Sequence, residues 1–185
     1  MKFDSPVRDF LIMALSLASA IMLGCVATTI VSNKDVQYYN KISRPMIIVE
    51  TSASVERDFV LYLEFELIDQ MKNVGVDAKI VFPTGLELND EIDNQIKEYI
   101  PDVIILLSQS ELFLQNAGMG NTTTCGITFN AKTFDVATSR DIWRAKITSK
   151  STTGFTNRSA ICRSLSVELV KKLREDGLIN NVKRD

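Results

Sequence analysis

The chain contains three cysteines and no histidine, and this combination limits the chemistry that its side chains can perform. Without histidine, Ser-His-Asp and Cys-His catalysis, His-ligated zinc and the ordinary near-neutral pH switch are excluded. The thiols fall into two groups, because Cys25 closes an apolar run near the start whereas Cys125 and Cys162 lie far along the chain. Cys25 is therefore a candidate for modification, and the other two are candidates for a bond with each other.

Residues 1–24 have the organisation of an export signal. A short charged head precedes an apolar stretch from Phe10 to Gly24, and the small Gly24 stands directly before Cys25. This pattern is typical of a secretory signal peptide. With cysteine after Gly24, it resembles a bacterial lipoprotein signal, which implies cleavage before Cys25 and diacylation of its sulfur. Val26 follows, and the lack of aspartate there resembles outer-membrane sorting, with the domain on the periplasmic side.

An uncleaved anchor is the alternative interpretation of the same segment. Phe10 to Val31 supplies about 20 apolar-to-neutral residues, enough to span a bilayer. Both interpretations place the folded part outside the cytoplasm. The residues that follow Cys25 are mostly polar and lack helical periodicity, so we expect a tether. The expected domain organisation is a signal peptide at 1–24, a lipidated cysteine and tether at 25–43, and a single periplasmic α/β domain at 44–185.

Cys125 and Cys162 remain once Cys25 is assigned to the lipid. In an exported protein, two leftover cysteines most often form a disulfide, so we expect a Cys125–Cys162 bond. Two buried free thiols are the alternative, and the pattern leaves both open.

The charge balance argues against several classes of partner. The chain has 21 basic and 23 acidic residues, for a formal net charge of −2. It contains neither a basic block that would indicate nucleic-acid binding nor an acidic tail. We expect no cofactor.

The densest acidic cluster comprises Glu87, Asn89, Asp90, Glu91 and Asp93. A calcium loop would need oxygen ligands at fixed offsets and a glycine for its sharp turn, and no glycine occurs between Leu86 and Asn94. Carboxylates in the first turns of a helix explain this cluster, so we expect no metal site. Because no carboxylates, lysines or serines group at a catalytic spacing, we also expect no enzymatic activity; a hydrolase is the least favoured alternative.

Hydrophobic periodicity predicts the order β-α-β-α-β-β-β-α. Continuous apolar runs predict three strands, and apolar residues at i+4 spacing predict amphipathic helices. The first half implies parallel crossovers and the second an antiparallel meander, which together give an α/β (α+β) mixed sheet with helices packed on one face. The strands are expected at Met46–Val49, Ala78–Phe82, Val103–Leu107, Thr124–Val136 and Ile142–Ser149, and the helices at Val55–Val74, at Asn89–Tyr99 and around Ile161–Leu173, with a loop at Asn116–Asn121.

Three cations lie on the last predicted hairpin. Arg140, Arg144 and Lys146 give this hairpin a small basic edge. Such charges ordinarily keep a strand soluble, and an exposed hairpin edge is also a natural docking surface for a partner protein. We therefore single them out as a candidate partner surface.

The element order resembles small outer-membrane lipoproteins whose domain is similar to the amino-terminal domain of TolB, a shape shared by the curli secretion lipoprotein and by lipoprotein activators of peptidoglycan synthases. Local support comes from the hairpin Asp135…Ser139-Arg140-Asp141-Ile142-Trp143. The resemblance implies a lipid-anchored scaffold that binds other cell-envelope proteins, as a component of a secretion, pilus or other envelope-spanning assembly. The alternative is an activator of a peptidoglycan-synthesising enzyme. Association with itself or with other proteins is compatible with either role.

The lipid prediction depends on Cys25 alone. Replacing Cys25 with serine removes the sulfur that would be acylated, so the full-length precursor should accumulate in the inner membrane. Fractionation of cells and the mass of the membrane-bound chain measure this outcome. Normal cleavage and release of the Cys25→Ser protein would show that the lipoprotein interpretation is wrong.

Overall fold

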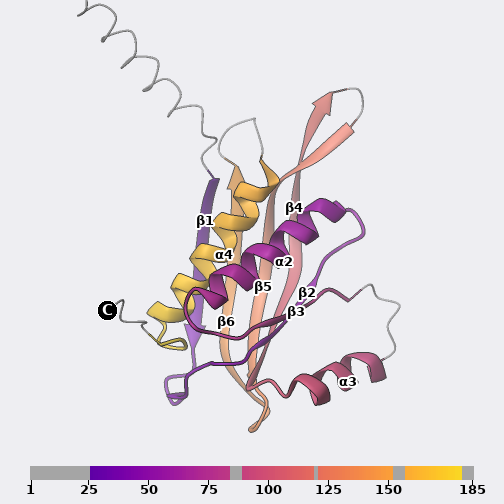
Figure 1. Cartoon of the computed structure of the whole chain (residues 1–185). Coiled ribbons are helices and arrows are strands. Elements are labelled where there is room, and N and C mark those ends of the chain that lie inside the picture. Colours follow the sequence, from indigo (N-terminus) through magenta and orange to yellow (C-terminus); the bar gives the residue numbers. More distant parts are fainter. Residues whose placement is uncertain (1–25, 84–88, 119–120, 152–156, 181–185) are drawn as a thin grey trace, which may run out of the picture.

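The computed structural model describes residues 26–83, 89–118, 121–151 and 157–180, with side chains omitted at 89–90, 116–118 and 121–122. These residues form one six-stranded sheet with three helices (Figure 1). The strand order is β1-β6-β5-β4-β2-β3. The elements are β1 (Val26–Lys34), β2 (Met46–Glu50), α2 (Arg57–Lys72), β3 (Lys79–Val81), α3 (Asn89–Tyr99), β4 (Val103–Gly118), β5 (Asn121–Asp135), β6 (Arg140–Ser151) and α4 (Arg158–Glu175).

The mixed sheet that the sequence predicts is confirmed. Strand β2 pairs in parallel with β3 and β4, whereas β4, β5, β6 and β1 pair antiparallel in succession. Strand β2 is short and apolar because both of its faces are buried, as Met46–Val49 shows. The antiparallel strands alternate between buried and exposed residues, because only one of their faces packs against helices.

Helices α2 and α4 pack beside each other on one face of the sheet (Figure 1). Their buried stripes have the predicted i+4 spacing: Phe59, Leu63, Leu67 and Met71 on α2, and Ile161, Leu165, Leu169 and Leu173 on α4. These residues meet Ile105, Leu107, Ile127, Phe129 and Ile147 of the sheet in one core. Glycine at Gly75, with φ of +74°, follows the end of α2 in the left-handed region that favours this residue.

Helix α3 does not join this layer, so the expectation that all helices share one face is wrong for α3 (Figure 1). The chain moves outward from β2 to β3 and then back past β2 to β4. Right-handed crossovers in opposite directions place their helices on opposite faces of a sheet. Met46 and Ile48 are correspondingly buried on the face opposite Ile47 and Val49. The Tyr99 hydroxyl fixes the end of α3 by donating to the Asp77 carbonyl at 2.5 Å.

The tether expected at 25–43 is wrong, because its residues belong to the fold. Val26–Lys34 pairs with β6 in an unbroken antiparallel register from Val26↔Ser151 to Lys34↔Trp143. Ile42 is buried and donates its N–H to the Leu178 carbonyl. Burial and the neighbouring Asp135 raise the pKa of Tyr38 to about 12, because both disfavour its ionised form. The domain therefore begins at residue 26 rather than at residue 44.

The loop expected at Asn116–Asn121 is also wrong in its extent. Strand β4 continues to Gly118 and β5 starts at Asn121, and only residues 119–120 between them lie outside the described part. β2 pairs with β4 only as far as Ser108, and β6 pairs with β5 only from Gly126 onward. The rest of the β4–β5 hairpin is a two-stranded arm that extends beyond the sheet (Figure 1).

The carboxylate of Asp176, directly after α4, joins three elements. Its Oδ2 accepts hydrogen bonds from Ser32 Oγ of β1 at 2.6 Å and from Trp143 Nε1 of β6 at 2.7 Å, and its Oδ1 lies 2.8 Å from Lys172 Nζ of α4. Burial alone would raise the pKa of Asp176, but these hydrogen bonds outweigh burial and lower it. Trp143 is buried, so its indole N–H depends on this single acceptor.

Asp176→Ala should therefore destabilise the fold by about 2–4 kcal/mol, because it leaves a buried indole N–H and a serine hydroxyl without their acceptor. Asp176→Asn keeps one acceptor oxygen and should cost less. A lowered folded-state pKa means that the carboxylate stabilises the fold above its unfolded pKa and loses this contribution as the pH falls through its folded pKa. Urea unfolding at pH 7 and in acid measures both effects. Equal stability of all three proteins would contradict the assigned role.

Candidate functional site

The candidate lipidation site lies at the start of the fold. Cys25 and the signal residues 1–24 are outside the described part of the chain. Val26, the next residue, is already in β1 and pairs with Ser151. An attachment at Cys25 would therefore lie one residue from the sheet, with no linker between them. None of the helices in the described segments is sufficiently long and apolar to cross a membrane.

The three cations predicted as a partner surface do not all lie on one face of the sheet. Arg144 and Lys146 of β6 project from the sheet face opposite α2 and α4, whereas Arg140 stands where the β5–β6 turn enters β6 and binds Asp35 at 2.7 Å. The hairpin is also not an edge of the sheet, because β1 pairs with β6. The prediction of an exposed hairpin edge is therefore wrong, and the surface is a sheet face instead.

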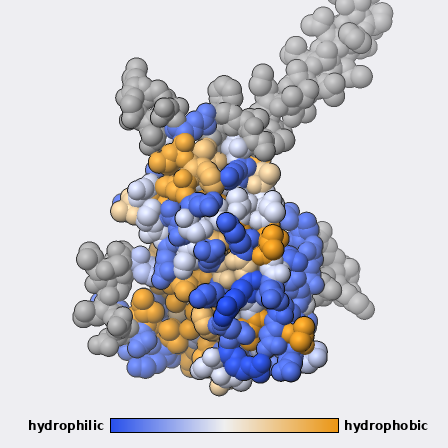
Figure 2. Space-filling view, turned by 180° about the vertical axis from the view of Figure 1, so that it is seen from behind, coloured by the Kyte–Doolittle hydropathy of each residue, from blue (hydrophilic) through white to orange (hydrophobic). Residues whose placement is uncertain are grey.

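We call the side of β5, β6 and β1 that faces away from α2 and α4 the open sheet face. Two further cations on it were not among the predicted residues. Lys132 of β5 and Lys150 of β6 are exposed and share the face with Arg144 and Lys146. Because side chains alternate between the two faces of a strand, the spacing of Lys132 and Lys150 in the predicted hairpin could have placed them there. In the view from behind, hydrophilic side chains gather across the middle of this face, with hydrophobic ones beside them (Figure 2). In the described part of the chain, no helix lies over β5, β6 and β1 on this side.

Local acids neutralise only part of this charge. Arg144 pairs with Asp141, and Lys146 Nζ lies 3.8 Å from a carboxylate oxygen of Glu111. Lys150 Nζ lies 3.4 Å from the centre of the Phe113 ring, a cation–π contact that leaves its charge in place. These pairs are exposed and therefore weak. The open sheet face thus keeps a positive excess that a carboxylate-bearing partner could use.

The outer edge of β1 is a second unpaired surface. β1 ends the sheet, and among the described residues no strand pairs with its outer side. Native edge strands are usually shortened, bulged or protected by charges. β1 has nine residues, an unbroken register and a single charge, Lys34, at its end.

The outer side of α2 exposes large apolar side chains. The exposed fractions of Leu61, Phe65 and Ile68 are 52%, 68% and 41%. Their spacing of four and three residues puts them on one side of the helix, opposite the buried stripe. We call these three residues the α2 stripe. Contiguous apolar surface of this kind marks interaction sites on folded proteins.

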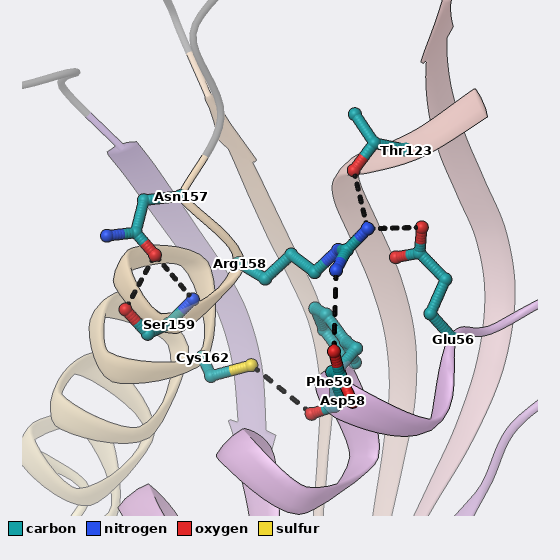
Figure 3. A network of polar contacts seen from close by, with 8 residues as sticks. All are labelled: Glu56, Asp58, Phe59, Thr123, Asn157, Arg158, Ser159 and Cys162. Atoms are coloured by element: carbon teal, nitrogen blue, oxygen red, sulfur yellow. Dashed lines mark hydrogen bonds and ion pairs between the residues drawn. The ribbon is translucent and has the colours of Figure 1, made fainter. Parts of the chain in front are cut away.

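Arg158 forms a polar network between α4, α2 and β5 (Figure 3). Its Nη2 donates to Glu56 Oε1 at 2.7 Å and to Thr123 Oγ1 at 3.1 Å, and its Nη1 lies 3.8 Å from Asp58 Oδ2. Glu56 directly precedes α2, Asp58 lies in α2 and Thr123 belongs to β5. The guanidinium of Arg158, the first residue of α4, therefore links α4 with α2 and β5. These contacts hold the start of α4 against α2 and β5, while Arg158 Nε and Glu56 Oε2 are buried without a hydrogen-bond partner among the described residues.

The expected Cys125–Cys162 disulfide is absent, since both cysteines are free. Cys162 is buried in α4 and its Sγ lies 3.5 Å from the Phe59 carbonyl of α2 (Figure 3). Cys125 sits where the β4–β5 register shifts and donates to the Phe113 carbonyl at 3.3 Å. A bulge changes which residue points inward. Here Thr124 is fully buried and Cys125 only partly.

The acidic cluster at the start of α3 lies only partly within the described residues. Glu91 and Asp93 are exposed on α3, while Glu87 and the side chains of Asn89 and Asp90 lie outside the described part. No group of three or more metal-ligating Cys, Asp or Glu side chains occurs among the residues that the structure describes.

Comparison with known proteins identifies the fold. No family model matches the chain, and no curated protein sequence matches it. The PelC dodecamer from Paraburkholderia phytofirmans is similar over 84% of this chain and 100% of its own, with a TM-score of 0.57 and 11% identity. A point variant of the same dodecamer gives a TM-score of 0.51 at 11% identity, over 80% of this chain and 97% of its own. Lipoprotein GNA1162 from Neisseria meningitidis gives 0.44 at 10% identity, over 72% and 99%. The chain thus has a fold similar to that of PelC.

The free thiols yield a direct prediction. Burial, and secondarily Glu66, raises the pKa of Cys162 to about 12, so this thiol should react only on unfolding. The partly exposed Cys125 should react with a maleimide in the native protein. Mass spectrometry of protein labelled before and after unfolding should show one and then two adducts in the chain that follows Cys25. Labelling of neither cysteine in unreduced, unfolded protein would indicate a bond between them.

Proposed function

We propose that this protein is a lipid-anchored, non-enzymatic structural subunit of an assembly in the bacterial cell envelope. It is held at the outer membrane on the periplasmic side through acyl chains on Cys25. Several copies stand side by side there and bind other envelope proteins. Secretion and pilus machines are the kinds of assembly that need such a subunit.

The start of β1 immediately after Cys25 is the observation that carries this proposal. An acylated Cys25 would seat the sheet next to the leaflet with one end of β1 toward it. Confinement to a surface raises the effective concentration of each copy for its neighbours, and a fixed orientation presents the same faces sideways every time. A scaffold benefits from such confinement, whereas an enzyme acting on a diffusing substrate does not require it.

The similarity to PelC supports a multi-copy arrangement, because PelC is a dodecamer. The resemblance to TolB-like, curli-secretion and synthase-activating lipoproteins points to the same compartment. Residues 26–34 form a strand and not a flexible linker, which counts against the alternative role as an activator of a peptidoglycan-synthesising enzyme. A domain seated at the leaflet has little reach toward a partner in another layer of the envelope.

The proposal is tested by the mass of the purified, lipidated protein in mild detergent. Native mass spectrometry should show complexes of several chains, and crosslinking in intact cells should show the same multiples. The Cys25→Ser protein, lacking confinement to a surface, should be shifted toward the monomer at equal concentration. A lipidated protein that stays monomeric in detergent and uncrosslinked in cells would contradict a multi-copy subunit.

A further inference from the structure

We propose, building on that function, that neighbouring copies contact each other head to tail. The α2 stripe of one copy docks on the open sheet face of the next, across β5, β6 and β1. The two surfaces lie on opposite sides of the same domain, so each copy would use one of them toward each neighbour.

The α2 stripe presents its apolar side chains in a fixed direction. Phe59, Leu63, Leu67 and Met71 are fully buried on the inner side of the helix, which fixes the direction of its outer side. Phe65, at 68% exposure, is the largest apolar side chain held open to water on this helix. Aromatic side chains of this kind are the usual anchors of protein interfaces.

The charges beside the stripe are acidic. Between Leu61 and Asp69 the helix carries Glu64, Glu66 and Asp69 and no cation, because Arg57 and Lys72 stand at its ends. Glu64 and Asp69 lie on the two flanks of the stripe. A partner that covers Phe65 would therefore gain from positive charge around an apolar patch.

The open sheet face offers that combination. Lys132, Arg144, Lys146 and Lys150 are exposed on it, and the local acids Glu111 and Asp141 balance only two of these charges. Half-buried Leu106 and Phe134 lie on the same face, and Val31 of β1 is 70% exposed. Apolar side chains thus alternate with cations where an acidic helix with an aromatic anchor would rest.

Anchoring of every copy in one leaflet favours the head-to-tail contact over a two-fold symmetric contact between the β1 edges of two copies. Antiparallel pairing of two β1 strands would put the two Cys25 residues at opposite ends of a nine-residue strand, about 30 Å apart. Both could not then be held in one leaflet. Copies related by an axis normal to the membrane keep the same end toward it. A head-to-tail contact between unlike surfaces forms a ring when the rotation closes.

Single cysteines provide the test, in lipidated protein with Cys125 replaced by serine. One variant carries Phe65→Cys and the other Lys132→Cys. A short bis-maleimide should crosslink the mixture into a dimer containing one chain of each variant, with little dimer from either variant alone. Tyr39→Cys, at 80% exposure in the segment after β1 and belonging to neither surface, is the matched control and should give no such dimer.

A second measurement separates the contact from the function. Phe65→Asp should raise the dissociation constant between copies about tenfold or more, whereas Tyr39→Asp should leave it unchanged. Crosslinking of Phe65→Cys alone, at the level of the mixture, would indicate a symmetric α2–α2 contact and overturn the inference. Oligomers that persist without any Phe65–Lys132 crosslink would overturn it while leaving the proposed function intact. A lipidated protein that never forms oligomers would overturn both.

Discussion

The attachment of β1 to the rest of the fold is the constraint on which this structure depends. Nine residues pair with β6 without a bulge, and the carboxylate of Asp176 receives hydrogen bonds from Ser32 in β1 and Trp143 in β6. The same carboxylate is paired with Lys172 of α4. The first strand, the last strand and the last helix therefore share one anion. Because β1 is fixed in this way, the position of Val26, the first described residue, is fixed as well.

This constraint gives a lipid anchor a structural meaning. With a flexible tether, acyl chains would hold the domain near a membrane in any orientation. With β1 starting at Val26, the end of the sheet where β1 begins and β6 ends would lie next to an acylated Cys25, and both broad faces of the domain would point sideways. In the proposed lipidated protein, the α2 stripe and the open sheet face would then be turned toward neighbouring copies rather than toward the leaflet. The structure thus suits recognition between anchored proteins.

The polar groups of the domain divide between internal clamps and available charge. Arg158 contacts Glu56, Asp58 and Thr123, and Asp176 accepts from or pairs with three donors, so both groups join separate elements of the fold. The cations of the open sheet face have weaker partners at the surface. Charges that hold the fold are thus paired across elements, whereas those suited to a partner stand on a sheet face that none of the described helices covers.

The sequence by itself determined the core. Apolar runs and i+4 spacing predicted β2, the first part of β4, α2 and α4, because burial of these side chains is the main driving force of folding. It could not predict β1, whose Thr28 and Ser32 face α4 through hydrogen bonds and thus hide the alternation of a strand. It could not predict the bulge at Cys125, since ladder register is a property of two paired strands. Only the tertiary structure decided which sheet face stayed open, because helix placement follows from crossovers between distant strands.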